Sequence, residues 1–311
     1  MDGQTLCADV RRLLLEGDSS NFVDDKVTLD FLWEAAIQIN HDLKLLTDIA
    51  TITTVDGTSN YDLPADFQEL YIVDSFNRYF VKENDGSNDY LLFWKDYGMM
   101  YYNGFNNSTL EQAISNNFSI VDSDPATVIK STATAVGAEV YDECTLTDST
   151  APFANVKIGD IIHNITDTSD GLVIGITSTS VITVALYDGT NNDWTSGDTY
   201  VLVPQGRLAL VLDPTPSTSG YTISIPYVKR PNPVYSSYGV YPFPATYRYI
   251  LTKYAAWLYK YRDKEPNYGD AWYKQYDIEI RRNNRVNNRL KNKSNFKVNF
   301  NKTSLGDRSW R

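Results

Sequence analysis

The sequence predicts an α+β fold with a helical bundle built from N- and C-terminal helices, a β-hairpin region and an inserted small all-β module. Apolar residues recur every three or four positions near both ends of the chain, which is the period of an amphipathic helix. Short runs of β-branched residues between Gly, Asp and Asn fill the middle and are typical of strands and turns. Residues 126–204 are rich in threonine and have only Lys130 and Lys157 as basic residues, so we expect a separate module there.

These changes in composition divide the chain into four parts. The parent domain comes in two pieces, residues 1–125 and 205–290, on either side of the β module at 126–204. A basic arm at 291–311 follows. With 311 residues, of which 42% are hydrophobic, the chain is long and apolar enough to bury a core in more than one domain.

The N-terminal piece begins with a predicted short helix at residues 6–15. Asp24 and Asp25 favour the start of a second helix, because carboxylates stabilise the positive end of the helix dipole. A single apolar stripe then predicts a helix of about five or six turns. The stripe consists of Leu29, Leu32, Trp33, Ala36, Ile39, Leu43 and Leu46.

Strands and loops follow this helix. Residues 51–55 and 70–73 are predicted strands, because they are rich in β-branched and aromatic side chains. Residues 84–89 are a predicted surface loop. They carry oxygen side chains, as calcium loops do, but lack the alternating ligands and closing glutamate of an EF-hand. Residues 90–97 are compatible with one short helix.

The segment 126–204 is predicted to be a small sandwich or barrel, because regularly spaced short strands are typical of these folds. Two Gly-Asp pairs, which begin at Gly159 and Gly197, each precede a strand, and we interpret both as turns that restart the sheet. The predicted strands are residues 128–130, 161–165, 172–177, 181–186 and 199–203.

After this module, residues 208–212 and 221–228 are predicted to pair as an antiparallel hairpin, which Pro231 and Pro233 terminate. Two helices then follow, with a break at Pro266.

An aromatic stripe runs along these two C-terminal helices. It comprises Ile250, Tyr254, Trp257, Leu258 and Tyr261, and then Trp272, Tyr276 and Ile280. We favour core packing between the two helices and against Leu32, Trp33 and Leu43. Stacking of these rings on single-stranded bases is the alternative.

The charge of the chain is strongly asymmetric. The net charge is −11, but residues 1–247 carry −21 and residues 248–311 carry +10. An acidic body argues against a general nucleic-acid binder and fits a subunit whose two ends meet different partners. Phe296, Val298 and Phe300 alternate like an edge strand, so we interpret the arm as a segment that orders on binding a neighbour.

The candidate partner-binding residues belong to this basic end. Arg281, Arg285 and Arg289 share one helix face. A solvated helix end, favoured by the helix dipole, is the alternative. The predicted set is Arg281, Arg282, Arg285, Arg289, Lys291, Lys293, Phe296 and Phe300.

Several short motifs occur in a characteristic order within residues 5–75 and 205–290. They are LLLEGDS at 13–19, LWEA at 32–35, YDLPADF at 61–67, LDPTP at 212–216, YTI at 221–223 and YVKRP at 227–231, followed by an alanine-rich aromatic helix. In this order the chain resembles the head-to-tail adaptor (connector) proteins of tailed bacteriophages, especially of short-tailed ones.

The resemblance implies a non-enzymatic ring, typically a dodecamer, bound beneath the portal protein. Such a ring extends the DNA channel, through which double-stranded DNA passes without being read, and carries tail or nozzle proteins. The implied location is the virion neck, at the head–tail interface, after assembly in the host cytoplasm. We expect the basic arm to contact the portal or an adjacent subunit, or else to line the channel near DNA phosphates. The insert at 126–204 departs from the compact family pattern.

No catalytic site, cofactor or metal site is predicted. The sequence has no phosphate-binding loop, no GxSxG and no HExxH, and only two histidines, His41 and His163. We expect no membrane partner, since no apolar run approaches the ~20 residues of a membrane span. The alternative function is a tail-associated carbohydrate- or receptor-binding protein that uses the β module, with Trp194 as its sole tryptophan for sugar stacking.

Overall fold

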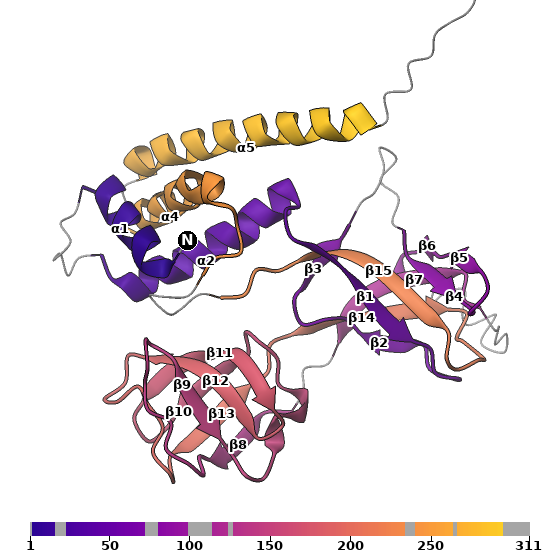
Figure 1. The fold of residues 1–311 in the computed structure, drawn as a ribbon, viewed down its shortest axis with the longest axis horizontal. Helices are drawn as coiled ribbons and strands as arrows, with labels where there is room; N and C mark the ends of the chain where they lie inside the picture. The colour runs from indigo at the N-terminus through magenta and orange to yellow at the C-terminus, as the bar shows by residue number, and fades with distance from the viewer. Residues whose placement is uncertain are drawn as a thin grey trace, which may run out of the picture.

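The computed structural model describes residues 2–15, 23–71, 80–98, 114–123, 127–233, 240–263 and 266–294, with the backbone alone over 285–294. These residues form a helical bundle, a two-sheet sandwich and a curled β module (Figure 1). Helices from both ends of the chain pack together in the bundle. The predicted α+β class is therefore confirmed.

The bundle consists of α1 (Gly3–Leu13), α2 (Asp25–Leu43), α4 (Arg248–Arg262) and α5 (Pro266–Ser294), and the 3-10 helix η2 (Ala245–Tyr247) leads into α4. Carboxylates cap the first two helices. Asp2 accepts a hydrogen bond from the backbone N–H of Thr5 at 2.7 Å, and Asp24 accepts one from Lys26 at 2.9 Å. Each cap satisfies an N–H group that has no partner inside its helix.

One apolar core joins the four helices, and Leu32, Ile39 and Leu251 are among its fully buried members. Two polar contacts cross the core. Arg248 Nη2 donates to Asp9 Oδ1 at 2.7 Å, which joins α4 to α1. The hydroxyl of Tyr276 donates to Asp42 Oδ2 at 2.7 Å, which joins α5 to α2. The two ends of the chain are therefore held together by both apolar packing and specific hydrogen bonds.

The sandwich consists of two sheets with one core between them. In the first sheet, β15 (Thr222–Lys229) pairs on one side with β1 (Thr47–Thr53) and on the other with β3 (Phe67–Leu70) and β4 (Lys82–Asn84), and β4 pairs with β5 (Asp89–Leu91). The second sheet has the order β2 (Asn60–Asp62), β14 (Arg207–Asp213), β7 (Asn117–Ser123) and β6 (Phe93–Trp94). Phe118 and Leu210 from one sheet meet Ile223 and Ile225 from the other.

The hairpin predicted from residues 208–212 and 221–228 is wrong, because the two strands lie in different sheets. β14 pairs with β7 over seven residue pairs, from Arg207 opposite Ser123 to Asp213 opposite Asn117. β15 pairs with β1 over seven others. Each strand therefore has a partner from far away in the sequence, and adjacency along the chain does not decide the pairing.

The helix predicted at residues 90–97 is also wrong. These residues contribute to β5 and β6, because β5 turns back onto β4. The predicted loop at 84–89 is confirmed as the turn between these two strands. Within it, Asp85 Oδ1 accepts hydrogen bonds from the backbone N–H groups of Ser87 (2.8 Å) and Asn88 (2.7 Å). The polar side chains of the loop therefore build the turn.

The β module (residues 129–203) is a six-stranded curled sheet with its own core. Its strands are β8 (Ile129–Thr132), β9 (Cys144–Thr147), β10 (Ile161–Asn164), β11 (Ser169–Ser178), β12 (Val181–Tyr187) and β13 (Thr199–Val203), in the order β8-β13-β10-β11-β12-β9, with the 3-10 helix η1 (Pro152–Asn155) after β9. All five predicted strands are present, and β9 is additional. Gly159 and Gly197 have φ values of 96° and 104°, which suit glycine in the predicted turns.

The β module contacts the bundle through α2 (Figure 1). Trp33 packs against Leu172 and Ala185 of the module. Its indole N–H donates to the carbonyl oxygen of Pro231 at 2.9 Å. Lys26 forms an ion pair with Asp188. The prediction that Trp33 packs between the helices is therefore wrong, because Trp33 follows Leu32 by one residue and so lies on a different face of α2.

Candidate partner-binding surface

The first half of α5 is fixed in the bundle. Tyr276 and Ile280 are buried in the core that α5 shares with α2 and α4, and Trp272 packs against the same core. The hydrogen bond from Tyr276 to Asp42 fixes the helix in register with α2. In Figure 1 the second half of α5, in yellow, extends beyond the end of α4. The bundle therefore serves as a rigid base for the basic end of α5.

The basic end of α5, residues 281–294, begins on an exposed face. Arg281 and Arg282 are both exposed, and Arg281 Nη2 pairs with Asp277 Oδ2 at 2.8 Å, one helical turn away. The Arg281 side chain is 71% exposed, so this ion pair contributes little to stability. Ile278, one turn before Arg281 and Arg282, is 62% exposed. An apolar side chain beside arginines is a composition typical of protein interfaces.

Six of the eight predicted residues lie on this one helix. Arg285, Arg289, Lys291 and Lys293 belong to α5, which continues to Ser294, four residues past the predicted end at 290. Arg281, Arg285, Arg289 and Lys293 recur at four-residue steps and so share one helix face. Phe296 and Phe300 lie outside the described residues. The structure thus places six of the eight predicted residues on α5, and it does not test what they bind.

The aromatic side chains between α4 and α5 form a packed cluster. The ring centroids of Tyr254 and Tyr276 are 4.9 Å apart, and so are those of Trp257 and Tyr273. Burial raises the pKa of the Tyr254 phenol to about 12. These buried contacts confirm the prediction of core packing and leave the rings of Tyr254 and Tyr276 inaccessible to bases.

Tyr261 is an exception to this packing, because its side chain is 62% exposed. It stands in the last turn of α4, where the chain turns toward α5. The predicted inward orientation of this residue is wrong.

Trp194 lies in the core of the β module and is 0% exposed. Its ring packs edge-on against Tyr200, with centroids 6.0 Å apart. A sugar needs an exposed ring for stacking. The carbohydrate-binding alternative therefore loses the residue on which it depended.

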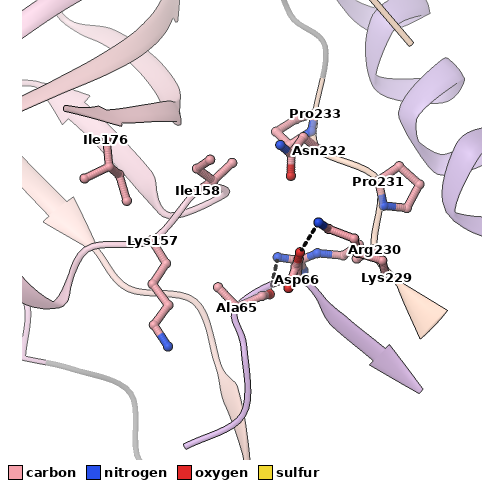
Figure 2. A pocket seen from close by; sticks show the side chains of 10 residues that line it. All are labelled: Ala65, Asp66, Lys157, Ile158, Ile176, Lys229, Arg230, Pro231, Asn232 and Pro233. Carbon is pink, nitrogen blue, oxygen red and sulfur yellow. Dashed lines mark hydrogen bonds and ion pairs between the residues drawn. The ribbon is translucent and has the colours of Figure 1, made fainter. Parts of the chain in front are cut away.

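A pocket between the β module and the sandwich was not predicted from the sequence (Figure 2). Lys157, Ile158 and Ile176 line it from the module, and Asp66 and Arg230 line it from the sandwich side. The one available signal was that Lys157 is one of only two basic residues in an acidic segment. Its neighbour Arg230 is distant in sequence and gives no such signal.

Neither a cluster of metal ligands nor a membrane-spanning helix occurs among the described residues. Across the described residues, no group of three or more His, Cys, Asp or Glu side chains is arranged to hold a metal ion. Within those residues, no helix is both long and apolar enough to cross a membrane.

Comparison with known proteins finds a similarity for the N-terminal part of the chain. The chain has no match among curated proteins. Residues 1–128 match the sequence model of the SU10 adaptor protein family, a match that includes α1, α2 and strands β1 to β7 and ends one residue before β8. Residues 1–128 are therefore similar to those of SU10 adaptor proteins, which are phage head-to-tail adaptors.

Proposed function

We propose that this protein forms a ring beneath the portal protein of a phage virion, where it extends the DNA channel and provides the platform for the tail. The observation that carries the proposal is the match of residues 1–128 to the SU10 adaptor protein family. This is a family of structural adaptors and not of enzymes. The proposed ring is a dodecamer at the virion neck, and tail or nozzle proteins bind to its outer side.

The basic end of α5 and the arm that follows are the proposed contact to the portal or to the adjacent subunit. Three features support this assignment. The bundle holds the first half of α5 rigidly, the row that begins at Arg281 is exposed where it is described, and the rest of the chain is acidic. Basic side chains on one subunit and acidic surface on the next attract each other at short range.

The test is to mix the purified protein with its portal protein and to analyse the mixture by native mass spectrometry. We expect a complex with several copies of this chain on each portal. Failure to form any complex would contradict the adaptor role. Monomeric behaviour of the protein alone would not, because a subunit of this kind can assemble on the portal as its template.

A chain truncated after Leu290 tests the arm separately. If the arm makes the contact, the truncated chain binds the portal more weakly than the full chain does. Equal binding by both chains would remove the arm from the proposal and leave the adaptor role standing.

A smaller role for the basic side chains of the arm is to line the channel near DNA phosphates. This role predicts an affinity for duplex DNA that falls steeply with salt and disappears on truncation after Leu290. Salt-independent binding, or binding that survives the truncation, would exclude it.

A further inference from the structure

The pocket between the β module and the sandwich has a volume of about 350 Å³. Figure 2 shows Lys157 and Ile158 on the module side and Ala65, Asp66 and Arg230 opposite them. A second hollow adjoins it and shares Lys157, Ile158, Ala65 and Arg230. Two cationic residues from different parts of the fold therefore line the same space, and in Figure 2 the ammonium group of Lys157 points away from Arg230.

Lys157 lies in an acidic segment and yet has no direct acidic partner among the described residues. Residues 126–204 contain ten acidic residues and only two basic ones. Nevertheless, within the described part of the chain, the ammonium group of Lys157 forms no hydrogen bond or ion pair, although its side chain is half-buried. Burial, reinforced by repulsion from Arg207, lowers the pKa of Lys157. Asp62, Asp160 and Asp66 are close enough to attract this charge, but none of them forms an ion pair with it in the described structure.

Arg230 directly follows β15 and reaches across to the β module. Its Nη2 donates to the carbonyl oxygen of Ala65 at 3.3 Å. The same atom lies 3.2 Å from the position that a Cβ would take at Gly159, so the guanidinium group packs on the turn that contains Lys157. Burial lowers the pKa of Arg230 as well. Among the described residues no carboxylate forms an ion pair with it.

The two carboxylates nearest to the pocket already have other partners. Asp160 accepts hydrogen bonds from the backbone N–H groups of Lys157 (2.9 Å) and Gln205 (3.0 Å), and it pairs with Arg207 at 3.3 Å. Asp66 accepts from the hydroxyl of Tyr227 at 3.0 Å and pairs with Lys229 at 3.3 Å. These engagements leave the charges of Lys157 and Arg230 available to an external anion.

We propose that this pocket binds a small oxyanion, which Arg230 holds from the sandwich side and toward which the side chain of Lys157 turns from the β module. Ammonium and guanidinium groups donate the charge-assisted hydrogen bonds that carboxylate and phosphate oxygens accept. Ile158, Ile176 and Pro231 form the apolar part of the wall. The oxyanion comes either from free phosphate or from the carboxylate of an acidic side chain on a bound chain. In both cases it bridges the module and the sandwich.

The test is isothermal titration of the full-length protein with inorganic phosphate at constant ionic strength. We expect one saturable site in the wild type. Lys157→Met and Arg230→Met should each weaken binding by about tenfold or more, because each removes a charge-assisted hydrogen bond. Lys157→Arg, which keeps the charge, should retain most of the affinity.

Lys130→Met is the matched control, because Lys130 is the only other basic residue of the segment and is exposed on β8. It should bind phosphate as the wild type does. A Lys157→Met chain that binds phosphate equally well, or a wild type that shows no saturable site, would overturn the proposal. Loss of folding does not explain an effect of Lys157→Met, since this ammonium group has no partner in the described structure to lose.

A parallel titration with acetate identifies the source of the oxyanion. Saturable acetate binding that Lys157→Met and Arg230→Met abolish would support an acidic side chain as the natural ligand. Binding of phosphate alone, with the same dependence on both residues, would support free phosphate.

Discussion

The hydrogen bond from Tyr276 to Asp42 is 2.7 Å long and joins α5 to α2, and no pattern in the sequence predicts it. Tyr276 is buried, so Tyr276→Phe should lower the free energy of unfolding by about 1.5–3 kcal/mol, the range for hydrogen bonds to charged groups. Urea denaturation measures this loss. Tyr273→Phe is the control, because Tyr273 is 44% exposed, and it should change stability by less than about 0.5 kcal/mol. Equal losses of unfolding free energy in both variants would show that the hydrogen bond from Tyr276 to Asp42 does not stabilise the fold.

Glu83 is a second residue with a measurable consequence. It is buried, Oε2 accepts from the backbone N–H of Ser115 at 2.9 Å, and Oε1 has no hydrogen-bond partner among the described residues. Burial raises its pKa above the ordinary value, so the folded state keeps a proton that the unfolded state has already released. This residue's contribution to stability should therefore fall as the pH rises from the ordinary glutamate pKa through the raised one.

Glu83→Gln removes this titration and should make the protein more stable than the wild type at neutral pH. The gain should shrink as the pH is lowered toward 4.5, the ordinary value from which the Glu83 pKa is raised. Urea denaturation at several pH values measures the free energy of unfolding of the wild type and of Glu83→Gln. Glu34→Gln, at an exposed position on α2, should leave the pH dependence unchanged. A constant difference between Glu83→Gln and wild type at all pH values would show that the charge of Glu83 is not the cause.

Among the elements, α2 packs in the bundle core with one face and against the β module with another. A substitution of Trp33 tests the contact with the module. Leu32 faces the bundle core, whereas Trp33 packs on Leu172 and Ala185 of the β module. Trp33→Ala should therefore speed hydrogen exchange in β11 and β12 while leaving α5 protected. Trp257→Ala, in the aromatic cluster of α4, should have the opposite pattern. Faster exchange of the module in both variants would mean that the module does not depend on this contact.

The elements also show which parts of the fold are readable from the sequence. Helices and strands are set by local periodicity, so the five strands of the module and most of the predicted stripe on α2 are found where the pattern predicts them, although α2 ends at Leu43, before Leu46, and Trp33 lies on another face. Strand pairing depends on residues far apart in the chain. β14 and β15 are consecutive, yet each pairs with strands from the N-terminal part. A hairpin is the simplest interpretation of two strands that are consecutive in the sequence. In the folded protein both strands pair with N-terminal strands and not with each other.

The candidate sites also differ in whether local sequence or long-range packing brings their residues together. The basic row that begins at Arg281 is visible in the sequence because its residues are close together and on one helix. The pocket of Lys157 and Arg230 is invisible there, because the two residues are far apart and meet only when the β module packs beside the sandwich. Trp194 is the reverse case. Its residue type suggested a ring for sugar stacking, but the ring is buried in the core and cannot contact a ligand.

For the whole molecule, the charge polarity of −21 in residues 1–247 and +10 in residues 248–311 makes any head-to-tail contact sensitive to salt. The range of electrostatic attraction falls from about 10 Å at 0.1 M salt to about 3 Å at 1 M. If the basic end of α5 contacts an acidic neighbour, replacing Arg281 and Arg282 together by Ser should weaken complex formation with the portal and flatten its salt dependence. Native mass spectrometry or sedimentation at increasing salt measures both quantities.

The matched control replaces Arg12 and Lys130 by Ser, which changes the net charge by the same amount at two exposed positions outside α5. Surface substitutions of this kind alter stability by about 0.5 kcal/mol or less, so both variants should remain folded. If the attraction arose from net charge alone, the two double variants would weaken the complex equally. If the row on α5 makes the contact, only the variant at Arg281 and Arg282 weakens it, because the effect of a charge on an interface depends on its distance from that interface.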